Sequence, residues 1–395
     1  MTKIINRTHK IEIDSTYKQQ VYFRKACGTS RFAWNWGLSK WEETYKAGNK
    51  TNAFELKKEF NRLKEQEFPW VYEVTKYASQ QPFINLQRAF QGFFNKKTKY
   101  PKYKKKGIRD SFYVGGDQIK IVGKYVKIPN LGWVRLRESL RFEGKINGVT
   151  ISLKADRWFV SVSVETSQLP AACESQATVG IDLGIKAFAT LSNGKSIPSN
   201  QPLKAKLGRL RRLQRKISRR KQGSKNRAKA KRAVARMHYK VGNSRSDFLH
   251  KVTTELTREY KYIVIENLDV SEMVQRKKLS RAISDSGWYE FRRQLIYKAE
   301  LRGNKIFIAD KWFASSKQCS GCDYRKKEMP LSEREFVCEK CNLKMCRDHN
   351  AATNLEKLLS TVSSTGIDAC GQDGSVVMLK TSLQPACEKQ ELSHV

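Results

Sequence analysis

The sequence lacks any run of about 18 or more apolar residues, which excludes a helix that spans a membrane. Its first thirteen residues alternate polar and apolar side chains and lack the extended apolar stretch of a signal peptide. No basic segment has the pattern of a lone amphipathic membrane anchor. We therefore expect a cytoplasmic protein without a membrane partner.

Acidic residues are absent from a long internal stretch. No Asp or Glu occurs from Leu183 to Ser246, whereas residues 203–245 carry eighteen Lys and Arg. The whole chain has 77 Lys and Arg against 38 Asp and Glu, a formal net charge of +39. This charge exceeds what solubility requires and indicates a polyanionic partner, of which nucleic acid is the first candidate.

The basic stretch also has helical periodicity. An apolar seam runs beneath its charges, and Gly223–Ser224 provides a turn into a second helix. We predict a basic helical hairpin at 203–245 that packs by one face and binds nucleic acid by the other. A merely solvated face is the alternative. The seam consists of Leu203, Leu207, Leu210, Leu213 and Ile217.

The 395 residues, 39% of them hydrophobic, suffice for two or three domains. Residues 16–106 have helical periodicity, and we interpret their aromatic side chains, including Phe32, Trp34, Trp36 and Trp41, as core. Residues 107–170 form short alternating runs separated by Gly and Asn turns. Together with a strand in residues 1–15, these runs predict a small β-barrel or sandwich into which the helices are inserted.

A polar linker at 167–177 separates this part from a predicted α/β sheet. The apolar runs Tyr262–Ile265 and Lys305–Ala309 are typical of strands buried on both faces, and a helical pattern lies between them. A last helix is predicted at 348–359, and a disordered tail follows Ser360. A meander of three further strands is predicted at 178–182, 187–191 and 195–197.

Two CxxC pairs, Cys319/Cys322 and Cys338/Cys341, are separated by fifteen residues. This spacing favours tetrahedral thiolate coordination of zinc. Four thiolates fill the coordination sphere, so the zinc should be structural rather than catalytic. We regard a redox role as the weaker interpretation.

Three acidic residues occur where buried elements end or begin. Asp182 closes the first strand of the sheet, Glu266 follows a buried strand, and Asp348 starts the last helix. Ligands sit at the carboxyl ends of strands in open α/β sheets, so the first two acids can meet if their strands are neighbours. Clustered carboxylates favour magnesium, and two such ions can support phosphodiester hydrolysis. Singly, Asp182 is equally consistent with a turn residue and Asp348 with a helix N-cap.

Four motifs resemble the TnpB family of transposon-encoded, RNA-guided DNA nucleases, which are related to the type V CRISPR effectors. They are Gly180–Lys186, Ile265–Leu268, Ser315–Cys322 and Arg347–Ala352. The resemblance implies a RuvC-like, RNase H-type nuclease domain in which Asp182, Glu266 and Asp348 are catalytic and bind the metal. It also implies magnesium and a transposon-derived guide RNA as cofactors.

The resemblance further implies a multidomain α+β architecture. The expected parts are a β-barrel-like wedge module (1–15 and 107–170), a helical recognition domain (16–106), a RuvC-like α/β nuclease domain (176–311 and 346–360), an inserted zinc ribbon (312–345) and a tail (361–395). The expected partners are the guide RNA and double-stranded target DNA, bound by a monomer in the nucleoid. One departure is Cys346, where the family often has an acid. We interpret it as an inert side chain rather than a fifth zinc ligand.

Candidate nucleic-acid contacts are distributed over the chain. By analogy with the family, two glutamines of the recognition domain read a short motif beside the target. The lysine-rich segment 95–106 suits phosphates, with occasional base stacking on its tyrosines, although a solvated loop is the alternative. The candidates are Gln80, Gln81, Lys104, Lys105, Arg211, Arg212, Arg219, Arg220 and Arg347.

A guided DNA-binding repressor that no longer cuts is the main alternative function. A relative of that kind is expected to have lost at least one of the three acids. All three are present, so the sequence favours a magnesium-dependent, RNA-guided DNA endonuclease.

Overall fold

The computed structural model describes residues 4–275, 278–311, 313–330, 333–363 and 376–378. The chain divides into two compact units, Met1–Gln168 and Leu169–Val395. Their boundary lies within the polar linker that the sequence predicts. Among the described residues, no helix has the length and apolar character needed to cross a membrane.

The helices of the first unit pack around aromatic side chains. They are α1 (Tyr17–Lys46), α2 (Ala53–Leu63), the short 3-10 helix η1 (Pro69–Glu73) and α3 (Lys76–Phe94). Helix α1 begins at a capping box, in which Thr16 and Gln19 satisfy each other's backbone N–H. Trp34 and Trp41 are buried, and Phe32 and Trp36 pack against the same cluster. The prediction that these aromatics form core is confirmed.

The strands of the first unit form one seven-stranded sheet in the order β2-β6-β7-β1-β5-β4-β3. The strands are β1 (Ile5–Asp14), β2 (Ser111–Gly115), β3 (Lys120–Val122), β4 (Tyr125–Ile128), β5 (Gly132–Leu136), β6 (Lys145–Lys154) and β7 (Arg157–Thr166), with a 3-10 turn η2 (Gly116–Gln118). Strands β2 and β3 are the two edges, so this sheet is open.

The prediction of a β-barrel is therefore wrong, since the sheet does not close. The positions of β1 and α1 explain why it stays open. Strand β1 pairs with β7 over residues 5–12 and with β5 only at its last two residues, so it joins two halves of one sheet. Phe23 of α1 packs between Phe112 and Trp158. A helix thus fills the interior in place of closure by a strand.

The second unit contains a six-stranded sheet in the order β10-β9-β8-β11-β12-β15. Strands β8, β11 and β12 are parallel, whereas β9, β10 and β15 run antiparallel to their neighbours. The predicted meander and both buried strands are confirmed. The bounds are β8 (Thr178–Leu183), β9 (Ala187–Leu191), β10 (Ser196–Pro198), β11 (Tyr262–Ile265), β12 (Lys305–Ala309) and β15 (Val376–Met378).

Strand β15 departs from the prediction of a disordered tail after Ser360. Its residues pair with Phe307–Ala309 at the edge of the sheet. Paired strands satisfy the backbone N–H and C=O groups that an edge leaves open. The other predicted tail residues beyond Ser363 lie outside the described residues.

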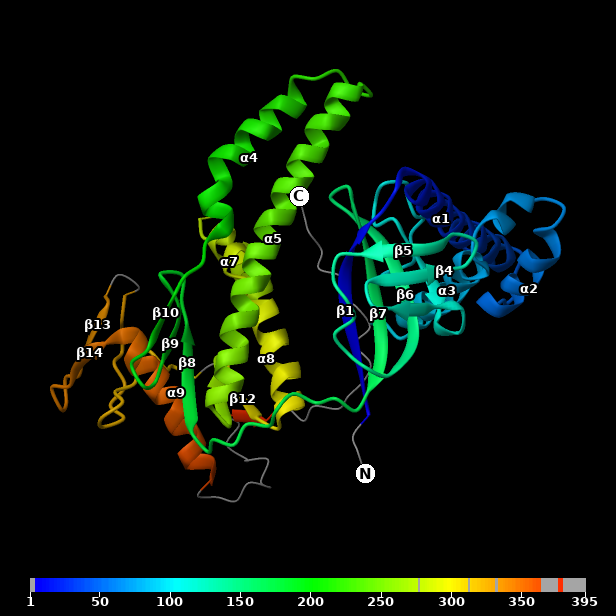
Figure 1. The fold of residues 1–395 in the computed structure, drawn as a ribbon. Helices are drawn as coiled ribbons and strands as arrows, with labels where there is room; N and C mark the ends of the chain where they lie inside the picture. The colour runs from blue at the N-terminus through cyan, green and yellow to red at the C-terminus, as the bar shows by residue number, and fades with distance from the viewer. Residues whose placement is uncertain (1–3, 276–277, 312, 331–332, 364–375, 379–395) are drawn as a thin grey trace. The chain divides into compact units, whose positions relative to one another are not determined.

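Helices cover both faces of this sheet (Figure 1). Helices α5 (Lys225–Glu259) and α8 (Trp288–Arg302) share one apolar core with alternate residues of β8, β11 and β12. Helix α9 (Arg347–Ser363) packs on the other face, where Leu355 meets Val264 and Phe307. Two short helices, α6 (Val270–Gln275) and α7 (Ser280–Ser286), lie between β11 and α8 in the chain.

The predicted basic hairpin is confirmed as α4 (Pro202–Ser218) and α5, which lie side by side in Figure 1. Leu210 is buried, and the other four seam residues are half-buried. Helix α5 continues well beyond the predicted hairpin, because its last turns pack into the sheet core through Leu249, Val252 and Leu256. The hairpin is therefore an extension of a helix anchored in the α/β unit.

Candidate functional site

The strand pair β8 and β11 brings Asp182 and Glu266 together. The strands are parallel neighbours, and Ile181 lies opposite Ile265. Asp182 and Glu266, each the next residue in its strand direction, therefore lie opposite one another. Side chains alternate between the faces of a strand. Ile181 and Ile265 point into the core under α5 and α8, so the acids lie on the face that α9 covers. The condition set by the sequence analysis, that the two strands are neighbours, is met.

Helix α9 carries Asp348 in its first turn, near enough to the two strand acids to interact with them electrostatically. Its small residues Ala351 and Ala352 are buried, and the helix packs directly on β8. Gly180, two residues before Asp182, permits this close packing: a Cβ there would lie 2.0 Å from the Ala352 carbonyl oxygen. A glycine in the strand and alanines in the helix therefore set the spacing between the elements that carry the acids.

The carboxyl groups strongly perturb one another. Burial, followed by the charges of Glu266 and Asp348, raises the pKa of Asp182 well above its ordinary value. Burial also raises the pKa of Glu266, against hydrogen bonds from Ser315 and Asp182 and the charge of Arg347. Raised pKa values in a cluster of acids are a hallmark of functional sites.

Asp348 is less tightly placed than the other two acids. Among the described residues, the ligand atoms of the four cysteines Cys319, Cys322, Cys338 and Cys341 all lie within 4.8 Å of one another. No set of three carboxylates in that part of the chain is so compact. The three carboxylates are therefore near enough to interact electrostatically but do not form so tight a set. Their hard oxygen atoms are the donor type that magnesium prefers.

Two further side chains, whose roles the sequence does not reveal, support Glu266. The Ser315 hydroxyl donates to Glu266 Oε1 at 2.8 Å and is 3% exposed. Asn354 of α9 donates to the carbonyl oxygen of Ser315 at 2.7 Å and to that of Gln318 at the same distance. The motif around Ser315 is visible in the sequence, but its contact with Glu266 depends on how α9 packs.

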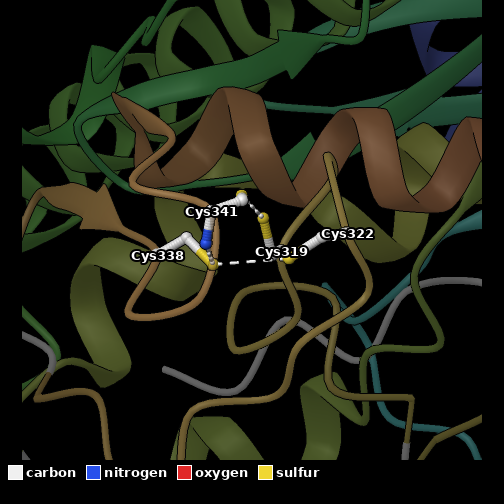
Figure 2. Close-up of side chains that lie close together, drawn as sticks. All are labelled: Cys319, Cys322, Cys338 and Cys341. Atoms are coloured by element: carbon white, nitrogen blue, oxygen red, sulfur yellow. Dashed lines mark hydrogen bonds between the residues drawn. The ribbon is translucent and has the colours of Figure 1, made fainter.

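The four cysteines of the predicted zinc site converge (Figure 2). Cys338 and Cys341 lie between β13 (Glu335–Val337) and β14 (Lys344–Cys346), an antiparallel pair. The Sγ–Sγ distances are 3.6 Å for Cys319 and Cys341 and 3.5 Å for Cys322 and Cys338. Tetrahedral zinc–sulfur bonds of about 2.3 Å place sulfur atoms roughly 3.8 Å apart, so the cluster has the size that zinc requires.

Backbone N–H groups donate to two sulfur atoms of this cluster, those of Cys319 and Cys338. Burial acts to raise the pKa of Cys338, but the N–H groups of Cys341 and Lys340 lower it to about 6. Gly321 donates to Cys319 Sγ at 3.3 Å. Cys346 is exposed on β14 opposite Glu335 and is not part of the cluster, which agrees with its interpretation as inert.

The predicted nucleic-acid contacts occupy different settings. Gln80 and Gln81 are half-buried on α3, where Gln81 also contacts Asn85. The ammonium of Lys104 lies 4.1 Å from the ring centre of Trp34, and Lys105 is exposed. The four hairpin arginines, Arg211, Arg212, Arg219 and Arg220, are all exposed.

Arg347 differs from the other candidates. Its guanidinium donates to the carbonyl oxygens of Pro330 and Glu333 at 3.2 and 3.5 Å. Its charge also opposes the rise in the pKa values of Asp182 and Glu266. The structure therefore places Arg347 beside the acidic site as well as against the zinc module.

Comparisons with known proteins agree with this fold. The chain resembles the protein in the "Cryo-EM structure of the Cas12f1-sgRNA-target DNA complex" with a TM-score of 0.58 and 16% identity, over 89% of this chain and 99% of that one. Family models match residues 159–277 (OrfB_IS605, "Probable transposase"), 288–355 ("Cas12f1-like, TNB domain") and 1–50 ("Helix-turn-helix domain"). Within 4–50, however, the structure contains β1 and the single long helix α1.

Comparison by sequence finds relatives with higher identity than this structure. The chain is 32% identical to "Putative RNA-guided DNA endonuclease InsQ" of Escherichia coli (strain K12), over 92% of this chain and 93% of the relative. It is 37% identical to a Streptomyces pristinaespiralis protein with the same functional name, over 78% and 76%. The chain thus has the mixed α/β fold of the Cas12f1 protein in that complex. By its sequence similarity over nearly the whole length of the Escherichia coli relative, it belongs to the TnpB family.

Proposed function

We propose that the chain is an RNA-guided DNA endonuclease of transposon origin, which binds a transposon-derived guide RNA and cleaves matched double-stranded DNA. The observation that carries the proposal is the meeting of Asp182, Glu266 and Asp348 on one face of the sheet. The functional names of the relatives support it. Base pairing by the guide selects the sequence, and the protein reads backbone shape and a short flanking motif.

The second unit is proposed as a RuvC-like nuclease domain with an inserted zinc ribbon, and the first as the wedge and recognition modules. The three acids would hold magnesium, which supplies an activated water and charge stabilisation for phosphodiester hydrolysis. Arg347 favours the ionised forms of these acids, because its positive charge acts to lower the pKa values of both Asp182 and Glu266.

The proposal is tested by purifying the chain with the RNA transcribed from its native locus. We expect this complex to cut DNA that matches the RNA when magnesium is present, and not when EDTA is present. Tight binding of matched DNA without cutting would favour a guided repressor instead. Failure to retain any RNA would contradict guided activity altogether.

The cysteine cluster is proposed to hold one structural zinc ion per chain. Replacing Cys338 by serine removes the sulfur with the lowest pKa among the shifted thiols, so zinc should be lost and the module that leads into Asp348 should unfold. We expect less than one tenth of wild-type cleavage, with zinc content measured by atomic emission. The exposed Cys346, changed to serine as the control, should keep both zinc and activity. Normal cleavage by a zinc-free Cys338→Ser protein would contradict this role.

Ser315 is expected to hold Glu266 in position for the metal. Replacing Ser315 by alanine removes a buried hydrogen bond to a carboxylate, which is worth about 1.5 to 3 kcal/mol. Cleavage should then require roughly tenfold more magnesium, and Mn²⁺ binding followed by electron paramagnetic resonance should weaken in parallel. Threonine at 315 should restore both values. Alanine at the neighbouring Ser316, whose side chain has no hydrogen-bond partner among the described residues, serves as the control.

A further inference from the structure

Residues 100–106, which we call the lysine strap, follow α3 and have no regular secondary structure. A segment with several lysines and no helix or strand is ordinarily a mobile loop. Here it lies along α1 and is attached to that helix at several points. Helix α1 itself is fixed in the aromatic core through Trp34 and Trp41, so the strap rests on a rigid support.

Asn35 is the central attachment. Its side-chain amide donates to the carbonyl oxygen of Lys104 at 3.0 Å, and its side-chain oxygen accepts from the Lys104 N–H at 2.8 Å. The Trp34 indole N–H donates to the carbonyl oxygen of Lys102 at 3.0 Å. These bonds satisfy both backbone groups of Lys104 and fix the direction of the chain on each side of it.

The strap's tyrosines serve as anchors too. Tyr103 donates to Glu42 Oε2 at 2.7 Å, and Tyr100 reaches the other oxygen of the same carboxylate at 3.4 Å. Tyr100 also packs edge-on against Phe90 and Phe93. The prediction that these rings stack on bases therefore competes with contacts that they already make within the protein.

The lysines of the strap divide into two kinds. Lys104 is exposed as a residue, but its ammonium lies 4.1 Å from the centre of the Trp34 ring, and desolvation there lowers its pKa to about 8. Lys102, Lys105 and Lys106 are exposed and form no ion pair with any described residue. Two acids that bond to the strap or to the adjacent Gly107 have other partners, because Glu42 accepts from the tyrosines and Asp110 pairs with Arg31 at 3.1 Å.

We propose that the lysine strap is a preorganised binding site for the phosphodiester backbone of a nucleic acid, with Lys102, Lys105 and Lys106 as its contacts and Asn35 as its positioning residue. Exposed, unpaired lysines attract phosphates and release counterions on binding. Fixing the strap in advance removes the entropic cost of ordering its backbone when the nucleic acid binds. This inference rests on the proposed function for the identity of the nucleic acid.

The test measures binding by the full chain as a function of salt concentration, without any cleavage step. The probes are a mixed-sequence single-stranded RNA, the RNA that copurifies with the chain, and a DNA duplex. The first variant changes Lys102, Lys105 and Lys106 together to glutamine. Its control changes three other exposed lysines of the same unit, Lys46, Lys50 and Lys58, and so removes the same charge elsewhere.

We expect the strap variant to lose roughly 2 to 3 from the log–log salt slope, since each phosphate contact contributes about 0.7 to 0.9. Lys104→Gln should change the slope little. Asn35→Ala, which alters no charge, should weaken binding about tenfold at an unchanged melting temperature. The probe with the larger loss identifies the strand that occupies the strap.

If the strap variant and its control lost equally in affinity and salt slope, net charge alone would explain the effect. That result would overturn the proposal. An Asn35→Ala protein with wild-type affinity would overturn the positioning role. A wild-type chain that binds none of the probes would instead refute the proposed function, so the two failures are distinguishable.

Discussion

Replacing Asp182 by asparagine should lower cleavage of matched DNA by about a thousandfold or more. A magnesium ligand contributes several kcal/mol of transition-state stabilisation, and each 1.36 kcal/mol corresponds to a factor of ten in rate. Binding of guide RNA and DNA should remain, because the substitution alters none of the exposed hairpin arginines that we expect to contact phosphates. The measurement is single-turnover cleavage by the protein–RNA complex.

The same substitution should leave stability unchanged or raise it. The folded-state pKa of Asp182 is raised, so its ionisation at neutral pH opposes folding, and a neutral amide of equal size removes this repulsion. Thermal unfolding of Asp182→Asn should therefore occur at an equal or higher temperature than that of the wild type. Asp247→Asn, at an exposed acid that pairs with Lys251 on the surface, is the control and should cut normally. A strongly destabilised Asp182→Asn protein would point to a structural role.

Replacing Gly180 by alanine should reduce cleavage about a hundredfold, although the glycine bears no reactive group. The added Cβ would lie 2.0 Å from the Ala352 oxygen and 2.6 Å from the Glu356 nitrogen, both backbone atoms of α9. Such contacts must open to at least 3.0 Å, so α9 must shift by about 1 Å and carry Asp348 with it. A misplacement of about 1 Å can cost a factor of about 100 in rate.

The control for this prediction is Gly208→Ala in α4. A Cβ there meets no atom within 4 Å, and alanine is favoured over glycine inside a helix by about 1 kcal/mol. We expect Gly208→Ala to cut normally and to unfold at a slightly higher temperature, whereas Gly180→Ala should also lose about 1 to 3 kcal/mol of stability from overpacking. Equal behaviour of the two variants would contradict the role assigned to the contact between β8 and α9.

The sequence allowed prediction of features that depend on local pattern. The apolar runs that end at Asp182 and Glu266 located two strands, and the periodic leucines from Leu203 predicted the hairpin. The CxxC spacing predicted a cluster whose sulfur atoms do converge. In each case, the signal lies within a few residues of the chain.

Features set by packing between distant segments were not predictable in this way. The close contact at Gly180 and the support of Glu266 by Ser315 both require the position of α9, which no local pattern specifies. The prediction of a closed barrel was wrong, because the sheet is open and Phe23 of helix α1 fills its interior. Strand β15 was missed because three residues in a Ser-rich tail acquire their conformation only by pairing with β12.

The central claim is that three acids distant in the sequence hold one metal site. Fe²⁺ can be loaded in place of magnesium, and with ascorbate and peroxide it generates hydroxyl radicals that cut the polypeptide beside the ion. We predict cuts near 182, 266 and 348 together, all suppressed by excess magnesium and absent from Asp182→Asn. Cuts confined to the cysteine module, or none at these three positions, would contradict the account.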